Sequence, residues 1–210
     1  RPWFFATDSD SEGAALARYL RAPLTSVNGA GHAVVEGWVD LDVDLGQVDQ
    51  MPVTIAGLSQ ENVANALAAA SAALAAGLPL SAVRSTLRAF TPDPATSPGR
   101  MNIWSVPVGR GQAHVILDFA HNEAGITALL RVARGLCPAG SAVHVSIGNA
   151  GDRTDAGIRE VARLAALGAD TVQLAAKPRY LRGRTQEQID TCTADPGGRR
   201  PRATRSSAVI

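Results

Sequence analysis

Cysteine, lysine and long apolar runs are all scarce in this sequence of 210 residues. The two cysteines, Cys137 and Cys192, are far apart and match no metal-binding or redox spacing, so neither a disulfide framework nor a metal centre is indicated. A reducing, cytoplasmic location is the default for such a chain. The alanine-rich stretch at 63–80 is interrupted by Gly77 and Pro79, so no apolar run is long enough to cross a membrane.

Lysine occurs once, at Lys177, against 19 arginines. The GxxxxGK[ST] pattern of a phosphate-binding loop is absent, so a lysine that clamps phosphate would have to lie outside this chain. The chain begins with Arg1 and runs directly into the apolar residues Trp3, Phe4 and Phe5, which we interpret as a cut inside a longer protein. A net charge of +1 gives no electrostatic argument for binding nucleic acid or an acidic surface.

The composition, 46% hydrophobic and 19% charged, is typical of a globular protein with a packed core. In the first half, turn glycines between short alternating runs favour β-hairpins, and apolar residues at helical spacing favour consecutive helices. Three prolines within residues 91–100, "TPDPATSPGR", indicate a linker and a domain boundary. The elements expected before the linker are a strand at 3–7, a helix at 11–21, hairpins over 27–46, a strand at 51–56 and helices at 59–77 and 80–90.

Strands and helices alternate after the linker, which predicts an α/β domain with a parallel sheet and right-handed crossovers. In such sheets ligands bind beyond the carboxyl ends of the strands, and polar residues follow each strand expected here. Residues 191–210 contain four arginines and no periodicity, so we predict a disordered or aberrant tail. The expected strands are 113–117, 142–147 and 171–174, and the expected helices are 123–135, 155–167 and 185–189.

The end of the first of these strands, "LDFAHNEAG", carries a carboxylate, an imidazole and a carboxamide close together. Asp118 lies where the strand ends and could accept hydrogen bonds from two ribose hydroxyls, as acidic residues do in nucleotide-binding sheets. Asn122 directly precedes a helical pattern, so a helix cap is the simpler interpretation of it. His121 is a candidate catalytic group, although a polar surface position is the commoner role of a lone histidine.

Two further patterns could contact anions. In "GNAGDRTDAG", Asp152 and Arg153 lie between turn glycines and a helix start whose free N–H groups suit an anion, although this motif is weak by itself. Arg100 in "SPGRMN" follows the linker directly. Arginine binds phosphate in a bidentate manner, and a solvated surface arginine is the alternative interpretation.

Asn62 and Asn65 share one face of the helix expected at 59–77. A carboxamide presents a donor and an acceptor together, which matches the edge of an adenine ring. Asn62 could instead cap the helix, whereas Asn65 lies inside it, where asparagine is a poor helix former. A structural role, capping together with a buried turn, explains the two asparagines as well as adenine binding does.

Five motifs, taken in order, resemble the Mur ligase family over residues 50–189. They are "NVANALAAASAALAAG", "SPGRMN", "LDFAHNEAG", "GNAGDRTD" and "KPRYLRGR". Within the family, the cyanophycin-synthetase group has the most similar pattern, with PGRMN followed by DYAHNP and GDRRD. The resemblance implies that residues 1–92 are the C-terminal portion of a central ATP-binding domain and that residues 99–190 form a C-terminal Rossmann-like domain. Phe119 and Glu123 stand where the family has tyrosine and proline.

The same resemblance implies ATP and Mg²⁺ as cofactors, with the nucleotide bound between the central and C-terminal domains. It assigns Asn65 to adenine, Asp118 to ribose and Arg100 to the nucleotide near the hinge. The other residues placed on the nucleotide side are Asn62, His121 and Asn122. The implied reaction activates a carboxylate as an acyl phosphate, and an incoming amino group converts this to an amide with release of ADP and phosphate.

The "KPRYLRGR" motif lies where members of the family bind the incoming amino acid. A cationic loop there would suit an acidic acceptor or a chain-end carboxylate, and a solvated charged loop is the alternative. The candidate substrate residues are Asp152, Arg153, Lys177, Arg179, Arg182 and Arg184.

The expected activity is acid–amino-acid ligation by part of a larger enzyme. A cyanophycin-type substrate is favoured, with a peptidoglycan precursor or a folylpolyglutamate-type substrate as the alternative. The expected partners are a small-molecule or peptide substrate, an amino acid, and the N-terminal part of the same enzyme, which would hold the phosphate loop and the magnesium ligands. This chain alone should then be inactive, and a non-catalytic nucleotide-binding remnant is the competing interpretation. Neither nucleic acid nor membrane is expected, and homo-oligomerisation is left open.

Overall fold

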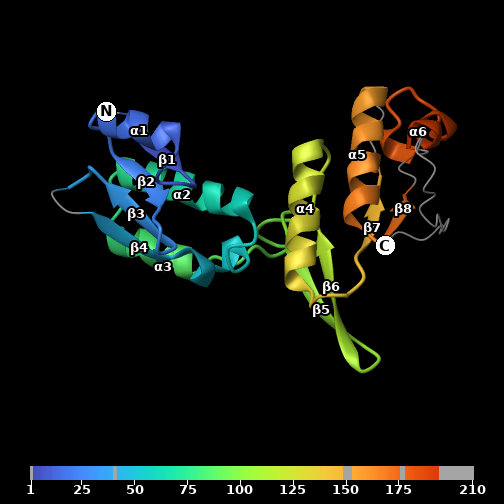
Figure 1. Ribbon diagram of the computed structural model, residues 1–210, viewed down its shortest axis with the longest axis horizontal. Helices are drawn as coiled ribbons and strands as arrows, with labels where there is room; N and C mark the ends of the chain where they lie inside the picture. The colour runs from blue at the N-terminus through green and yellow to red at the C-terminus, as the bar shows by residue number, and fades with distance from the viewer. Residues whose placement is uncertain (1, 40–41, 149–152, 176–177, 194–210) are drawn as a thin grey trace. The chain divides into compact units, whose positions relative to one another are not determined.

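The chain divides into two compact units, residues Arg1–Pro98 and Gly99–Ile210, which are described separately below. The structure is a computed structural model, and it describes residues 2–39, 42–148, 153–175 and 178–193. Figure 1 shows both units as mixtures of helices and strands. Within the described residues, no helix combines the length and the apolar character that a membrane span requires.

The first unit contains a sheet of four strands in the order β1-β2-β3-β4. Strands β1 and β2 run parallel because helix α1 connects them, and β2, β3 and β4 are antiparallel neighbours. Ser11 caps α1 by accepting a hydrogen bond from the Ala14 N–H. The elements are β1 (Phe4–Ala6), α1 (Glu12–Tyr19), β2 (Leu24–Val27), β3 (His32–Glu36) and β4 (Val43–Gln47).

Two helices, α2 (Gln60–Ala75) and α3 (Leu80–Ala89), complete the core of the first unit. Their apolar residues recur at helical spacing and pack against the inner residues of β3 and β4. The fully buried part of this core includes Val35, Leu45, Met51, Leu67 and Leu74.

The strand predicted at 51–56 is wrong, because this segment contains a short 3₁₀ helix, Pro52–Thr54, which follows another at Val48–Gln50. Pro52 suits the first position of such a turn, since its missing N–H would have no partner there. The Thr54 hydroxyl contacts the carbonyls of Val48 and Met51, which closes the turn from within. Local hydrogen bonding therefore outweighed the short apolar run that favoured a strand.

An ion pair fastens α1 to the sheet of the first unit. The Arg18 guanidinium donates two hydrogen bonds of 2.8 Å to the two carboxylate oxygens of Glu36 on β3. The hydrogen bonds from Arg18 hold the pKa of the Glu36 carboxyl below its ordinary value. The guanidinium is partly exposed, so the pair contributes only about 0–1 kcal/mol to stability.

Glu36→Gln should flatten the acid limb of the stability curve, which is the fall in the free energy of unfolding of the first unit as the pH is lowered. A carboxyl whose folded pKa is lowered stabilises the fold above its unfolded pKa, about 4.3, and loses that stabilisation as the pH falls through the folded value. Urea unfolding between pH 2.5 and 6 measures the slope. Arg18→Gln should flatten the same limb, and unchanged slopes in both variants would show that the pair does not form.

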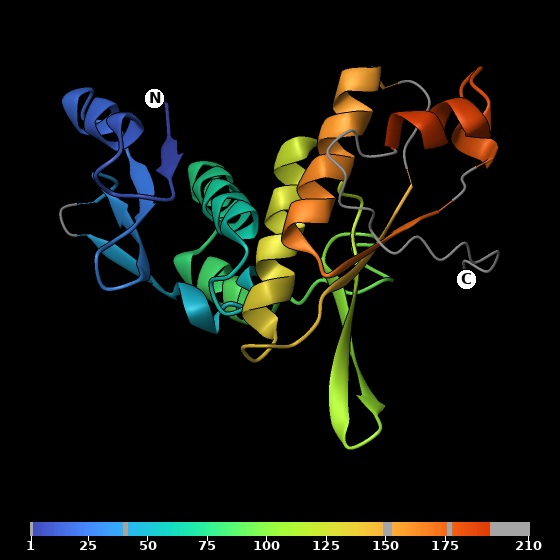
Figure 2. The ribbon, with the colours of Figure 1, turned by 45° about the vertical axis from the view of Figure 1, so that its right-hand side comes forward.

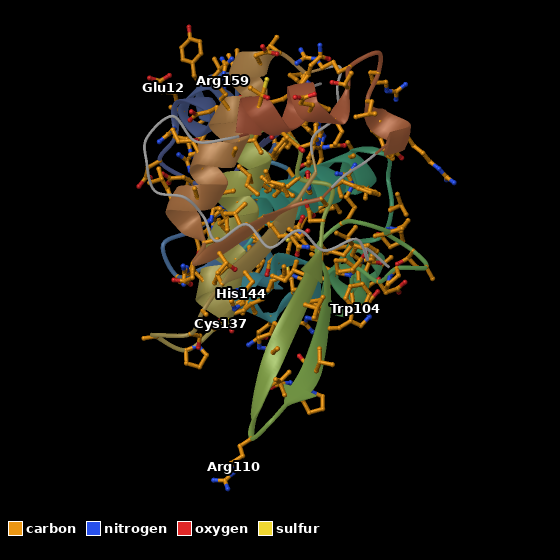
Figure 3. All side chains as sticks on the ribbon, turned by 90° about the vertical axis from the view of Figure 1, so that its right-hand side faces the viewer. Glu12, Trp104, Arg110, Cys137, His144 and Arg159 are labelled. Atoms are coloured by element: carbon orange, nitrogen blue, oxygen red, sulfur yellow. The ribbon has the colours of Figure 1, made fainter. Side chains whose placement is uncertain are left out.

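The second unit begins with a β-hairpin of β5 (Asn102–Val108) and β6 (Gly111–Leu117), joined by a two-residue turn. Gly109 has a φ of 59°, which suits the first position of a type II′ turn. Figure 3 shows Arg110 at the tip of the hairpin. The strand predicted at 113–117 therefore exists, but its observed partner is β5, an antiparallel strand that sequence analysis did not predict.

Strands β7 and β8 pair in parallel, which confirms the predicted α/β fold class with a parallel sheet. The predicted sheet was larger, because it included the strand at 113–117; among the described residues, β6 pairs with β5 and β7 with β8. Helix α5 makes the crossover between β7 and β8. The elements after the hairpin are α4 (Glu123–Leu136), β7 (His144–Ile147), α5 (Asp155–Gly168), β8 (Thr171–Leu174), a 3₁₀ turn (Pro178–Tyr180) and α6 (Gln186–Thr193).

Helices α4 and α5 lie side by side over the parallel strands, as the view in Figure 2 shows. A Cβ added to Gly168 would lie 2.6 Å from a methyl carbon of Leu130, so the absence of a side chain allows the close approach of the two helices. The core between the helices and strands consists of Ile126, Leu130, Val143, Val161, Ala165 and Val172.

Helix α6 extends three residues into the segment 191–210 that was predicted as a disordered tail. Buried residues on this helix explain the extension, because Ile189 is 4% exposed and Cys192 is 8% exposed. The rest of that segment, residues 194–210, lies outside the described residues.

Candidate functional site

Asp118 lies directly after β6, and both of its carboxylate oxygens accept backbone hydrogen bonds. The Met101 N–H donates to Oδ2 at 2.9 Å, and the Ala120 N–H donates to Oδ1 at 2.7 Å. The carboxylate therefore joins the start of the hairpin to the turn that leads into α4. An ionised carboxylate offers about four lone pairs, so each oxygen can still accept a further hydrogen bond.

The segment 99–102 is fixed by two more hydrogen bonds. The side chain of Asn102, which is 1% exposed, accepts from the Gly99 N–H at 2.7 Å, and the Gly99 carbonyl accepts from the Phe119 N–H at 2.8 Å. Met101 adopts a φ of 49°, a left-handed conformation that these bonds stabilise. We call residues 99–102 and 118–120 together the clasp, because the two sequence motifs hold each other.

Arg100 and Phe119 are the exposed members of the clasp. The guanidinium carbon of Arg100 lies 5.8 Å from the centroid of the Phe119 ring, a cation–π distance. In the part of the chain that the structure describes, no carboxylate forms an ion pair with Arg100. The arrangement presents a guanidinium and a carboxylate from adjacent backbone segments, which suits a ligand that carries both phosphate and hydroxyl groups.

His121 and Asn122 lie in the turn between the clasp and α4. The His121 Nδ1–H donates to the Phe119 carbonyl at 2.8 Å, which leaves Nε2 as an acceptor in the neutral ring. Asn122 is the N-cap of α4, and its Oδ1 accepts from the Gly125 N–H at 2.8 Å. The structure thus shows the capping role of Asn122 that sequence analysis had offered as the simpler interpretation.

The amino ends of α4 and α5 lie close together in the second unit. A Cβ added to Gly157 in the first turn of α5 would lie 3.8 Å from a carboxylate oxygen of Glu123 at the start of α4. Thr154 caps α5 by accepting from the Gly157 N–H. Glu123 at the start of α4 and Thr154 at the start of α5 therefore lie at the same end of the helix pair.

Arg184 is held by neighbouring groups in the second unit. It forms an ion pair with Asp155 on α5 and donates a hydrogen bond of 3.1 Å to the Arg153 carbonyl. The hydrogen bond from Arg184 holds the pKa of the Asp155 carboxyl below its ordinary value. Among the predicted substrate residues, the structure thus brings Arg184 and Arg153 together, whereas Arg179 and Arg182 are exposed.

Two of the predicted substrate residues, Asp152 and Lys177, lie outside the described residues.

Asn62 and Asn65 both lie on α2 of the first unit. The cap of α2 is Ser59, whose hydroxyl accepts from the Asn62 N–H, so the proposed capping role of Asn62 is wrong. The Asn62 side chain instead donates to the Val53 carbonyl at 2.8 Å, which fastens α2 to the preceding 3₁₀ turn. Asn65 is exposed, one helical turn further along α2.

A hollow of about 250 Å³ lies between α2 and α3 of the first unit, and it does not include either asparagine. Alanine, valine and leucine side chains line it, with Thr86 as the polar exception. Because no charged group faces it, this hollow does not suit a phosphate-bearing ligand.

The described residues do not offer a magnesium site, since no group of three or more histidine, cysteine, aspartate or glutamate side chains lies together among them. An ATP-type ligand fits better, because Asp118 keeps lone pairs for hydroxyl groups and Arg100 is exposed beside it.

Sequence analysis missed three parts of the clasp: the hydrogen bonds of Asp118, the buried Asn102 and the contact of Phe119 with Arg100. Asn102 was inside the motif "SPGRMN", and a polar residue at the start of a strand was a usable signal. The contact between Gly99 and Phe119 joins segments that are 20 positions apart, so local spacing could not reveal it.

Comparison with known proteins identifies the family to which this chain is similar. The family model described as "Mur ligase, glutamate ligase domain" matches residues 99–206. Cyanophycin synthetase from Synechocystis sp. is 34% identical over 134 residues, which is 64% of this chain and 14% of the relative. Cyanophycin synthetase from Trichormus variabilis is 33% identical over 120 residues, which is 57% of this chain and 13% of the relative. The chain thus spans only about a seventh of the length of these relatives.

Among solved structures, a UDP-N-acetylmuramoyl-L-alanyl-D-glutamate–2,6-diaminopimelate ligase matches 90% of this chain and 39% of its own chain. The TM-score is 0.44 and the sequence identity is 19%. The family model matches more than half of the chain and includes both motifs of the clasp. This chain therefore belongs to the Mur ligase family.

Proposed function

We propose that this chain is part of an ATP-dependent acid–amino-acid ligase of the cyanophycin-synthetase type. The observation that carries the proposal is the clasp, in which Asp118 and Arg100 are presented from backbone segments that hydrogen-bond to each other. The identity to cyanophycin synthetases supports this type over ligases of peptidoglycan precursors or folylpolyglutamates.

In this proposal the second unit binds the ribose and phosphate part of ATP. The remaining lone pairs of Asp118 accept the two ribose hydroxyls, and the Arg100 guanidinium donates to phosphate oxygens. The free Nε2 of His121 and the side-chain amide of Asn122 lie next to this site in sequence and are available for further contacts.

The first unit would then be the C-terminal portion of the central ATP-binding domain. Asn65, exposed on α2, presents a donor and an acceptor for the adenine edge, and Asn62 keeps the start of the same helix in place.

The proposed reaction has two steps. A substrate carboxylate attacks the γ-phosphorus of ATP, which forms an acyl phosphate and releases ADP. The amino group of an amino acid then attacks the acyl carbon, an amide bond forms, and inorganic phosphate leaves. Mg²⁺ neutralises charge in phosphoryl transfer when it is bound. The described residues show no ligand set for it, so we assign it to other parts of the enzyme.

The substrate residues stay a prediction. Exposed Arg179 and Arg182 are free to bind a carboxylate of the incoming amino acid, with Lys177 as a further candidate. Arg153 and Asp152 stay predicted for other contacts with the substrate. Arg184 would shape this loop rather than bind substrate, because Asp155 already pairs with it. The predicted cytoplasmic location likewise stays a prediction.

A second candidate is a nucleotide-binding remnant without activity. The two candidates differ in the phosphate-binding loop, which the 210-residue sequence lacks and the enzyme would need.

An ADP-release screen tests the proposal. The longest protein that the gene region encodes around this sequence is assayed with ATP and each amino acid in turn, with the 210-residue chain as the matched control. We expect amino-acid-dependent ADP release from the longer protein and none from the chain alone. Absence of release from a longer protein that contains a phosphate-binding loop would contradict the proposal.

A further inference from the structure

Phe119 is an apolar ring that the fold leaves 59% exposed, directly after Asp118. In the described part of the second unit, it is not among the residues that form or border the core. An exposed ring contributes little through burial, so its position needs another explanation.

The backbone at Gly99 leaves space for the Phe119 ring. A Cβ added to Gly99 would lie 2.4 to 2.7 Å from three carbons of the Phe119 ring, so the ring occupies the space that any other side chain at position 99 would fill. Gly99 also has a φ of 70°, a conformation that glycine adopts without strain. The hydrogen bond from the Phe119 N–H to the Gly99 carbonyl fixes the two segments together at the same point.

The Arg100 guanidinium lies over the Phe119 ring, 5.8 Å from the ring centroid. An arginine that binds phosphate must hold a long side chain in one orientation, and each freely rotating side chain that becomes ordered on binding weakens the affinity. Within the described residues no carboxylate orients Arg100, which leaves the ring as the group that can do so.

We propose that Phe119 is a positioning residue: its ring, seated on Gly99, orients the Arg100 guanidinium for the phosphate groups of the nucleotide. This inference rests on the proposed function, because it needs Arg100 to contact ATP. It assigns a role to the aromatic ring of the "DFAHN" motif, which sequence analysis treated only as a substitution of tyrosine.

A double-mutant cycle tests the inference in the longer protein, with the dissociation constant of ATP measured by calorimetry. Phe119→Leu should weaken ATP binding about two- to fivefold, the size of an exposed cation–π contact. Phe119→Tyr keeps the ring and should bind like the wild type. In an Arg100→Ala background, Phe119→Leu should have no further effect. Trp104→Leu, which removes another half-exposed ring of the same unit, is the matched control and should change nothing.

Three outcomes would overturn the inference. Equal weakening by Phe119→Leu with and without Arg100 would show that the ring does not act through the guanidinium. Unchanged affinity in Arg100→Ala, with amino-acid-dependent ADP release intact, would remove the inference and leave the proposed function standing. Absence of ATP binding in the wild type would contradict both.

Discussion

Ile126→Ala should lower the free energy of unfolding of the second unit by about 3 kcal/mol, within the usual range for a buried isoleucine. Ile126 is 1% exposed on α4 and packs in the core between the helices and the parallel strands. The substitution removes three buried carbon atoms and leaves a cavity, because α4 and α5 are already in close contact at Gly168 and cannot collapse further.

Hydrogen exchange of backbone amides measures this effect in each unit separately. The amides of β7 and β8 should lose protection by about two orders of magnitude, while those of β2 and β3 in the first unit keep theirs. Leu167→Ala is the matched control on α5, since this leucine is 71% exposed and its removal should cost less than about 0.5 kcal/mol. Equal loss of protection in both units would instead show that the chain unfolds as one cooperative block.

The helices were predictable because their apolar residues recur at a spacing that only a helix satisfies. Helix α5 was expected at 155–167 and is found at Asp155–Gly168, and β8 was expected at its observed bounds. The errors occurred where partners distant in sequence decide the structure. β5 has an exposed, mixed pattern that favours no element, and it becomes a strand only because β6 provides its hydrogen bonds.

The candidate site was predictable in its residues but not in its internal contacts. A carboxylate at a strand end indicates a ligand, and the sequence contains no information about which backbone groups that carboxylate already binds. The structure shows Asp118 accepting from Met101 and Ala120, so the residue has a structural task in addition to the proposed contact with ribose. Asn122 likewise caps α4 whether or not it meets a nucleotide.

Asp118→Ala should therefore have two separable effects. Removal of the carboxylate leaves the N–H groups of Met101 and Ala120 without their charged acceptor, and each such bond is worth about 1.5–3 kcal/mol. Both hydrogen bonds are only partly buried, and water can replace part of the loss, so we expect the second unit to lose about 2–4 kcal/mol of stability. In the longer protein, ATP affinity should fall by at least about tenfold, because the ribose contact and the fixed position of Arg100 disappear together.

Asp118→Asn separates these effects, because an amide has one oxygen where the carboxylate has two. One backbone N–H would keep an acceptor and the other would face the amide N–H₂ group, so asparagine should recover only part of the lost stability. The stability is read from urea unfolding of the 210-residue chain, and the affinity from calorimetric titration of the longer protein with ATP. If Asp118→Ala lowered stability without any change in ATP affinity, the carboxylate would be a purely structural clamp. The ribose assignment, and with it the main support for a nucleotide at the clasp, would then be wrong.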